Sequence, residues 1–216
     1  MTPLRKYHAA LLRHFGPQGW WPGETPFEVM VGAILAQNTA WTNVEKAIAN
    51  LKTYGLLDPR RLDEIDAGTL ALAIRPAGYF NVKARRLKSY VDWFVRRFDG
   101  DPGRMKQVPL PRLREELLEV KGIGPETADS ILLYALDLPS FVVDAYTYRV
   151  LTRHGLVPEE TTYDEMKELL EKALPAKVPL YNEFHALAVA VGKKFCRAKP
   201  RCEECPLRRF LPPGGP

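Results

Sequence analysis

The sequence lacks any long apolar run that could serve as a leader or a membrane span. In the first segment, MTPLRKYHAALLRHFG, charged residues and histidines interrupt every apolar stretch, so a signal-peptide core is absent. The longest uncharged run, Val29 to Val44, carries several polar residues and falls short of the about 20 mainly apolar residues that a spanning helix needs. These absences predict a cytoplasmic protein with no membrane partner.

Cysteine is scarce, with three residues that all lie between Cys196 and Cys205. An odd, clustered set fits metal ligation better than a disulfide framework. The composition is 46% hydrophobic and 26% charged, which excludes a disordered tail, a collagen-like repeat and a disulfide miniprotein. A chain of 216 residues can build one large core or two small lobes.

Acidic residues are sparse in two stretches of a chain whose net charge is +5. Residues 75–97 hold seven bases and one acid, and residues 193–209 hold seven bases and two acids. Local basic stretches suit a surface that meets a polyanion, but scattered solvated charge explains the counts equally well.

Sustained polar–apolar alternation is also missing, and nearly every segment has helical periodicity instead, which predicts an all-α fold. The segment at 27–36 has no polar face and should be a central buried helix. The predicted helices span residues 4–15, 27–36, 41–52, 60–65, 67–75, 82–98, 111–120, 125–136, 145–154, 163–173 and 180–195.

The segment at about 113–136 reads as helix, tight turn and helix around Lys121-Gly122-Ile123-Gly124. The glycines permit a sharp bend, while Ile123 can point into the core. The helix that starts at Pro125 then offers unpaired amides and a positive dipole end to a phosphate oxygen. This pattern predicts a sequence-independent clamp on the DNA backbone, although a plain helical hairpin is a common alternative.

Asp144 follows the apolar run Phe141-Val142-Val143 and precedes a helix. The ordinary interpretation is an N-cap that satisfies the first turn of that helix. Its position shortly after a phosphate clamp favours a second interpretation. There the carboxylate could stabilise positive charge on a sugar or orient a water.

With these motifs, the sequence resembles the helix-hairpin-helix (HhH-GPD) DNA glycosylases of the endonuclease III superfamily over almost its whole length. The resemblance also rests on the stretch Ile34-Leu35-Ala36-Gln37-Asn38-Thr39, on Gly78-Tyr79-Phe80-Asn81-x-Lys83-Ala84 and on the closing cysteines. It implies a DNA repair enzyme that acts as a monomer on double-stranded DNA containing a damaged base, at the nucleoid. The implied organisation is a helical barrel lobe at 26–138 and a second lobe made of 1–25 with 139–216, the base being flipped into a cleft between them.

The resemblance also assigns roles to single residues. Asp144 is expected to be the catalytic aspartate, and Gln37 to enter the duplex and fill the hole left by the extruded nucleotide. A polar helix cap is the ordinary alternative for Gln37. The residues expected to contact DNA are Gln37, Lys121, Gly122, Gly124 and Thr127.

At position 126 the sequence differs from the members of the superfamily that also cut the DNA strand. Those members carry a lysine at this position, whereas here the segment reads Gly124-Pro125-Glu126-Thr127-Ala128. Without an amine at that position no Schiff base can form there. We therefore expect a monofunctional glycosylase without AP lyase activity, in which Asp144 assists water. Glu126 is either a second catalytic acid or an acid stabilised by the dipole of its helix.

Glu126, the Lys-Gly-Ile-Gly turn and Trp20-Trp21-Pro22 together resemble the 3-methyladenine glycosylase branch. An N3-alkylated adenine carries positive charge, and an aromatic face attracts a flat cation by about 0.5–2 kcal/mol. Core packing is the alternative for each aromatic residue, and Trp21 is the first choice for the pocket. The candidates are Trp20, Trp21, Phe27 and Trp41. The functional alternatives are an endonuclease III-like enzyme for oxidised pyrimidines or mismatches, with or without lyase activity, and a non-catalytic DNA-binding module.

The cysteines of the closing cluster, Cys196, Cys202 and Cys205, resemble the [4Fe–4S] motif of the family incompletely. The first spacing is one residue short, and Leu211 stands at the place of the fourth cysteine. Three thiolates could hold a labile cluster with another fourth ligand, a zinc ion with water or His185, or nothing. We expect a cluster in preference to an empty site. The bases of this loop, expected to face phosphate, are Arg197, Lys199, Arg201, Arg208 and Arg209.

Overall fold

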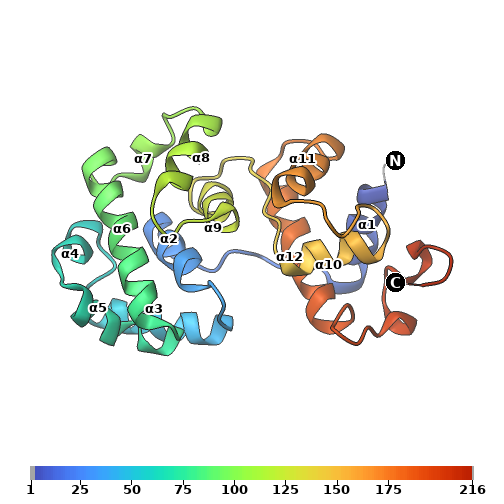
Figure 1. Cartoon of the computed structure of the whole chain (residues 1–216), viewed down its shortest axis with the longest axis horizontal. Coiled ribbons are helices and arrows are strands. Elements are labelled where there is room, and N and C mark those ends of the chain that lie inside the picture. Colours follow the sequence, from blue (N-terminus) through green and yellow to red (C-terminus); the bar gives the residue numbers. More distant parts are fainter. Residues whose placement is uncertain (1–2, 216) are drawn as a thin grey trace. The chain divides into compact units, whose positions relative to one another are not determined.

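The computed structural model describes residues 3–215 (Figure 1). These residues form helices and turns without a strand, which confirms the all-α prediction. No helix in this range combines the length and the apolarity that a membrane crossing requires. The chain divides into two compact units, a central unit of residues 22–138 and a terminal unit of residues 3–21 with 139–215.

The other helices of the central unit lie around the long helix α6, which is green in Figure 1. A 3-10 turn, η1, covers Arg75–Ala77, and a π-helical turn, η2, covers Ile131–Ala135. The α-helices are α2 (Pro26–Leu35), α3 (Trp41–Thr53), α4 (Pro59–Glu64), α5 (Ala67–Ala73), α6 (Phe80–Phe98), α7 (Pro102–Met105), α8 (Leu110–Glu119) and α9 (Pro125–Ser130).

The terminal unit combines the first helix with the last three. Two 3-10 turns, η3 (Cys202–Glu204) and η4 (Arg208–Phe210), follow them. The α-helices are α1 (Pro3–Phe15), α10 (Ala145–Arg153), α11 (Tyr163–Ala173) and α12 (Val178–Lys194). Helix α12 packs against α1 and α10, and Gly192 permits the second contact because a Cβ there would lie 2.4 Å from the Tyr146 ring.

Helix α2 is the buried helix of the central unit, as its missing polar face predicted. Thr25 caps it by accepting a hydrogen bond from the Glu28 amide at 3.1 Å, and Pro26 occupies the first turn. Every residue from 27 to 35 is buried. The Phe27 ring stacks on Phe94 of α6 with centroids 6.0 Å apart.

The hairpin of α8 and α9 differs from the prediction in its second helix. A single helix to residue 136 was expected, but from Ile131 the chain widens, and the amide of Leu136 bonds to the carbonyl of Ile131. The residues of this π-helical turn are all buried, so their periodicity did not separate it from an ordinary helix. Arg114 of α8 and Asp129 of α9 join the two helices through a two-bond ion pair.

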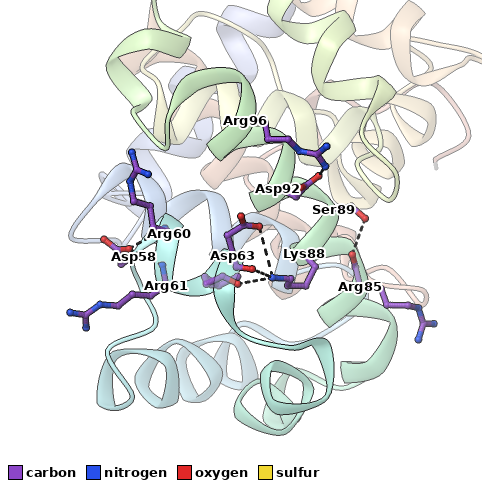
Figure 2. Close-up of polar contacts among 10 residues, drawn as sticks. Asp58, Arg60, Arg61, Asp63, Arg85, Lys88, Ser89, Asp92 and Arg96 are labelled. Carbon is purple, nitrogen blue, oxygen red and sulfur yellow. Dashed lines mark hydrogen bonds and ion pairs between the residues drawn. The ribbon is translucent and has the colours of Figure 1, made fainter.

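The basic side chains of residues 75–97 have several different structural roles. Lys83 is buried and donates to the carbonyls of Leu35 and Ala77 at 2.8 and 2.7 Å. Figure 2 shows that Lys88 donates to carbonyls at the end of α4 and that Arg96 pairs with Asp92. Much of the basic charge of this stretch therefore has partners within the protein.

Candidate DNA-binding hairpin and acid site

The hairpin turn uses its two glycines for different reasons. Gly122 has φ of +93°, and a Cβ there would lie 2.3 Å from Cγ of Arg86. Gly124 has φ of −98° and ψ of 177°, which other residues also adopt, and a Cβ there would meet no atom within 4 Å. Ile123 between them is buried, as predicted. Gly122 is thus required by the fold, whereas the space beside Gly124 is open.

Gln37 links the end of α2 to this turn. Its Nε2 donates to the carbonyl of Gly122 at 3.1 Å and to Oγ1 of Thr127 at 2.9 Å. Its Oε1 accepts a hydrogen bond from Arg86. Gln37 and Thr127 are therefore brought together with the hairpin, but by bonds within the central unit. Entry of Gln37 into a duplex, which remains a prediction, would require these bonds to break.

Three further side chains near the hairpin and the start of α6 are exposed. Lys121 and Glu126 both face solvent on either side of the turn. Tyr79, which sequence reasoning did not select, is 72% exposed and has left-handed backbone with φ of 45°. A glycine followed by a bulky residue at a helix start was the available signal for it. Its ring offers a surface on which a base can stack.

In the terminal unit, Asp144 caps α10, which confirms the ordinary interpretation. Its Oδ1 accepts a hydrogen bond from the Thr147 amide at 2.7 Å. Its Oδ2 lies 3.7 Å from Nε2 of His185 on α12, an ion-pair distance. Only 11% of the Asp144 side chain and 6% of the His185 side chain are exposed. Sequence reasoning did not find this pair.

The pKa of Asp144 reflects competing effects. Burial raises the pKa, but the pairing with His185 and the bonds from Thr147 together outweigh burial. The net effect holds the pKa below its ordinary value. The carboxylate therefore stays ionised although it is largely removed from water.

The four aromatic pocket candidates do not form one group within either unit. Trp20 and Trp21 belong to the terminal unit, where the Trp20 ring meets His185 edge-on at a centroid distance of 5.8 Å. Phe27 is buried against Phe94 in the central unit, which favours core packing for it. Trp41, also in the central unit, donates to Glu45 from its indole nitrogen at 3.0 Å.

The closing cysteines line one small pocket with Leu211 and His154. They form no disulfide, and Arg153 lies 3.5 Å from Sγ of Cys196. Burial raises the pKa of the Cys205 thiol, and the neighbouring thiols add to the shift while backbone bonds oppose it. Within residues 3–215, no group of three His, Cys, Asp or Glu side chains is arranged to hold a metal ion.

His185, considered as a zinc ligand from the sequence, pairs with Asp144 instead. The histidine that lines the cysteine pocket is His154. It ends α10 and is buried. The three thiols thus share a pocket without forming a complete cluster site.

A family profile described as HhH-GPD superfamily base excision DNA repair protein matches residues 31–176. The chain is 50% identical over 209 residues to a protein of Methanocaldococcus jannaschii with the provisional description of a DNA repair glycosylase, covering 96% of this chain and 94% of that protein. It is 30% identical over 186 residues to endonuclease III of Sulfolobus acidocaldarius, covering 85% and 80%.

A solved structure gives a similar match. The 3-methyladenine DNA glycosylase of H. pylori, crystallised with 1,N6-ethenoadenine, has a TM-score of 0.76 and 31% identity to this chain. The match covers 90% of this chain and 98% of that one. It therefore includes residues of both compact units.

Proposed function

Because this chain belongs to the HhH-GPD superfamily of base excision DNA repair proteins, as its motifs predicted, we propose that it is a monofunctional glycosylase for alkylated purines such as 3-methyladenine. It would act as a monomer on double-stranded DNA. The observation that carries the proposal is the buried Asp144 carboxylate, which its surroundings hold in the ionised form. Membership of this superfamily supports a DNA glycosylase, and we propose in addition the alkylated-purine lesion and the absence of lyase activity.

The proposed reaction is hydrolysis of the N-glycosidic bond. Water adds its oxygen to C1′ of the sugar, the bond from C1′ to the base nitrogen breaks, and its electron pair leaves with the base. The water proton passes to Asp144 or to solvent, and an abasic sugar with a hydroxyl at C1′ remains. Positive charge builds on the sugar in the transition state, so an ionised Asp144 stabilises it.

The placement of amines supports hydrolysis over lyase chemistry. Glu126 occupies the position at which the strand-cutting relatives carry lysine. Burial and, to a lesser extent, the charge of Arg86 lower the pKa of Lys83 to about 8. Nevertheless, this amine already donates to two carbonyls in the core, which favours a structural role over a catalytic one. Lys121 is exposed before the turn, where a phosphate contact suits it.

The alkylated-purine specificity rests on the terminal unit. Trp20 borders His185, the partner of Asp144, and so places an electron-rich indole close to the acid site. A cationic base such as 3-methyladenine is attracted to an aromatic face and already leaves readily, so it needs little acid catalysis. The similarity to the H. pylori 3-methyladenine glycosylase agrees with this specificity.

The test is base release from a panel of defined duplexes containing 3-methyladenine, 1,N6-ethenoadenine, an oxidised pyrimidine or a G·T mismatch. We expect release of the alkylated purine, strand breaks only after heating with alkali, and no covalent trapping by borohydride. Trapping would overturn the monofunctional assignment. Release of the oxidised pyrimidine or mismatched thymine alone would overturn the lesion assignment.

The glycine turn supplies a prediction about DNA contact. Gly124→Ala should leave the free energy of unfolding within about 0.5 kcal/mol of wild type, since the Cβ meets open space. It should weaken DNA binding about tenfold, because a methyl group keeps a phosphate from the first amides of α9. Fluorescence anisotropy and chemical denaturation measure the two effects.

Gly122→Ala is the contrasting variant at the same turn. Its left-handed φ and the contact with Arg86 should reduce stability by about 1–3 kcal/mol. Unchanged DNA affinity for a folded Gly124→Ala protein would contradict backbone clamping at this turn.

The cysteine pocket supplies a prediction about the [4Fe–4S] cluster, whose presence in this protein is a proposal. Leu211→Cys adds a fourth thiol to the pocket that Leu211 lines, and should increase bound iron and sulfide after anaerobic reconstitution. Pro213→Cys, at an exposed neighbouring position, is the matched control. Equal and air-stable iron content in wild type and Leu211→Cys would show that three cysteines suffice.

A further inference from the structure

The Asp144 carboxylate contains one oxygen that the helix cap explains and one that it does not. Oδ1 accepts the hydrogen bond from the Thr147 amide, as the side chain of an N-cap residue usually does. Oδ2 is turned to Nε2 of His185, on a helix distant in sequence. A cap alone would not need a buried imidazole at this second oxygen.

The surroundings of the pair leave His185 as the titratable side chain that faces the second carboxylate oxygen of Asp144. Helix α10 also bears Tyr148 and Arg149, but Tyr148 donates to the Glu159 carbonyl and Arg149 to the Cys196 carbonyl. The loop after α1 supplies the uncharged ring of Trp20. On α1, His8 packs edge-on against Phe184, and its pKa is lowered by burial against an opposing effect of Glu183.

Trp20 and the core hold the imidazole in place. The two rings meet edge-on with an interplanar angle of 78°, and His185 is 5% exposed in the middle of α12. A buried imidazole with so few accessible orientations keeps Nε2 directed to the acid.

We infer that His185 is the positioning residue of the proposed glycosylase reaction, holding Asp144 ionised and aimed by a buried imidazole–carboxylate pair. The inference rests on the proposed function, because it concerns the charge state of Asp144, the acid that the proposed reaction uses. Without His185, burial would act on Asp144 with only Thr147 opposing it, and the protonated, inactive form would become populated nearer to neutral pH.

The test compares single-turnover base release from a 3-methyladenine duplex across pH for wild type, His185→Phe and His185→Gln. Wild type should show a flat rate through the weakly acidic range. His185→Phe keeps an aromatic ring but removes both ring nitrogens, so its rate should fall as pH falls. The acid limb of the profile should rise by about one pH unit or more, with a tenfold change in rate for each unit. His185→Gln retains a donor near the place of Nε2 and should lie between them.

Two controls separate positioning from a general loss of structure. His14→Phe changes an exposed histidine of the same unit and should leave the pH profile unchanged. Affinity of His185→Phe for a duplex with an uncleavable abasic analogue should stay within about twofold of wild type, because the change acts on the rate and not on DNA binding. If His185→Phe does not fold, the shifted acid limb of His185→Gln decides the matter.

The possible outcomes distinguish the two levels of the proposal. An active wild type whose pH profile is unaltered in both His185 variants would overturn the role of His185 and leave the glycosylase assignment standing. If the wild type releases no alkylated purine, the proposed function itself is contradicted. In that case the same pH series on whichever lesion is released tests the pair.

Discussion

Asp144→Asn should lower base release by on the order of 10³-fold or more while the protein stays folded and binds DNA. Asparagine is a good N-cap, and its side-chain oxygen can still accept the Thr147 amide bond at the start of α10. It has no negative charge to stabilise the developing positive charge on the sugar. The loss should therefore appear in the chemical step.

The measurement is single-turnover release of 3-methyladenine with alkali development, together with thermal unfolding and DNA affinity. Asp58→Asn is the matched control, because Asp58 caps α4 by accepting from the amides of Arg60 and Arg61. It should retain full activity. Loss of DNA binding or of folding in Asp144→Asn would mean that the residue is structural, and unchanged release would exclude it from the chemistry.

Local pattern was enough to predict most of the helices and the position of the acid, although the short helix α7 was not predicted. Asp144 could be selected because a cap between an apolar run and a helix is readable over a few residues. The buried segment of α2 was equally clear from its missing polar face. These features depend on neighbours in sequence, so sequence alone specifies them.

Features that depend on distant partners could not be predicted in the same way. His185 looked like a candidate zinc ligand, yet tertiary packing places it against Asp144. Gln37 was selected for a role in DNA, while its bonds to Gly122, Thr127 and Arg86 depend on three separate segments. The π-helical turn within the hairpin escaped prediction because all of its residues are apolar or buried.

Arg114→Met should reduce the free energy of unfolding by about 3–5 kcal/mol, a large loss for a single substitution. The Asp129 side chain is fully buried, and Arg114, 19% exposed, is bonded to both of its carboxylate oxygens at 2.9 and 3.2 Å. Removing the guanidinium leaves a carboxylate in the core without this cation. For a chain of this size the midpoint of thermal unfolding should fall by about 10 °C.

Arg112→Met, on the same helix, is the control, because Arg112 is 59% exposed. Its partners are the exposed Glu115 and the buried Glu116, and Glu116 keeps Arg97 as a second partner. The expected cost of Arg112→Met is about 0–1 kcal/mol. The double variant Arg114→Met/Asp129→Asn should recover part of the stability, since an amide is cheaper to bury than a carboxylate. Equal costs for Arg112→Met and Arg114→Met would contradict this interpretation.

The Arg114–Asp129 pair also ties stability to DNA binding, because it joins the two helices on either side of the Gly122–Gly124 turn. A hairpin that clamps phosphate through backbone amides needs those amides fixed before DNA arrives, since ordering them on binding would cost affinity. Arg114→Met should therefore weaken DNA binding even at temperatures where it is fully folded. Arg112→Met should not, beyond the loss of one surface charge.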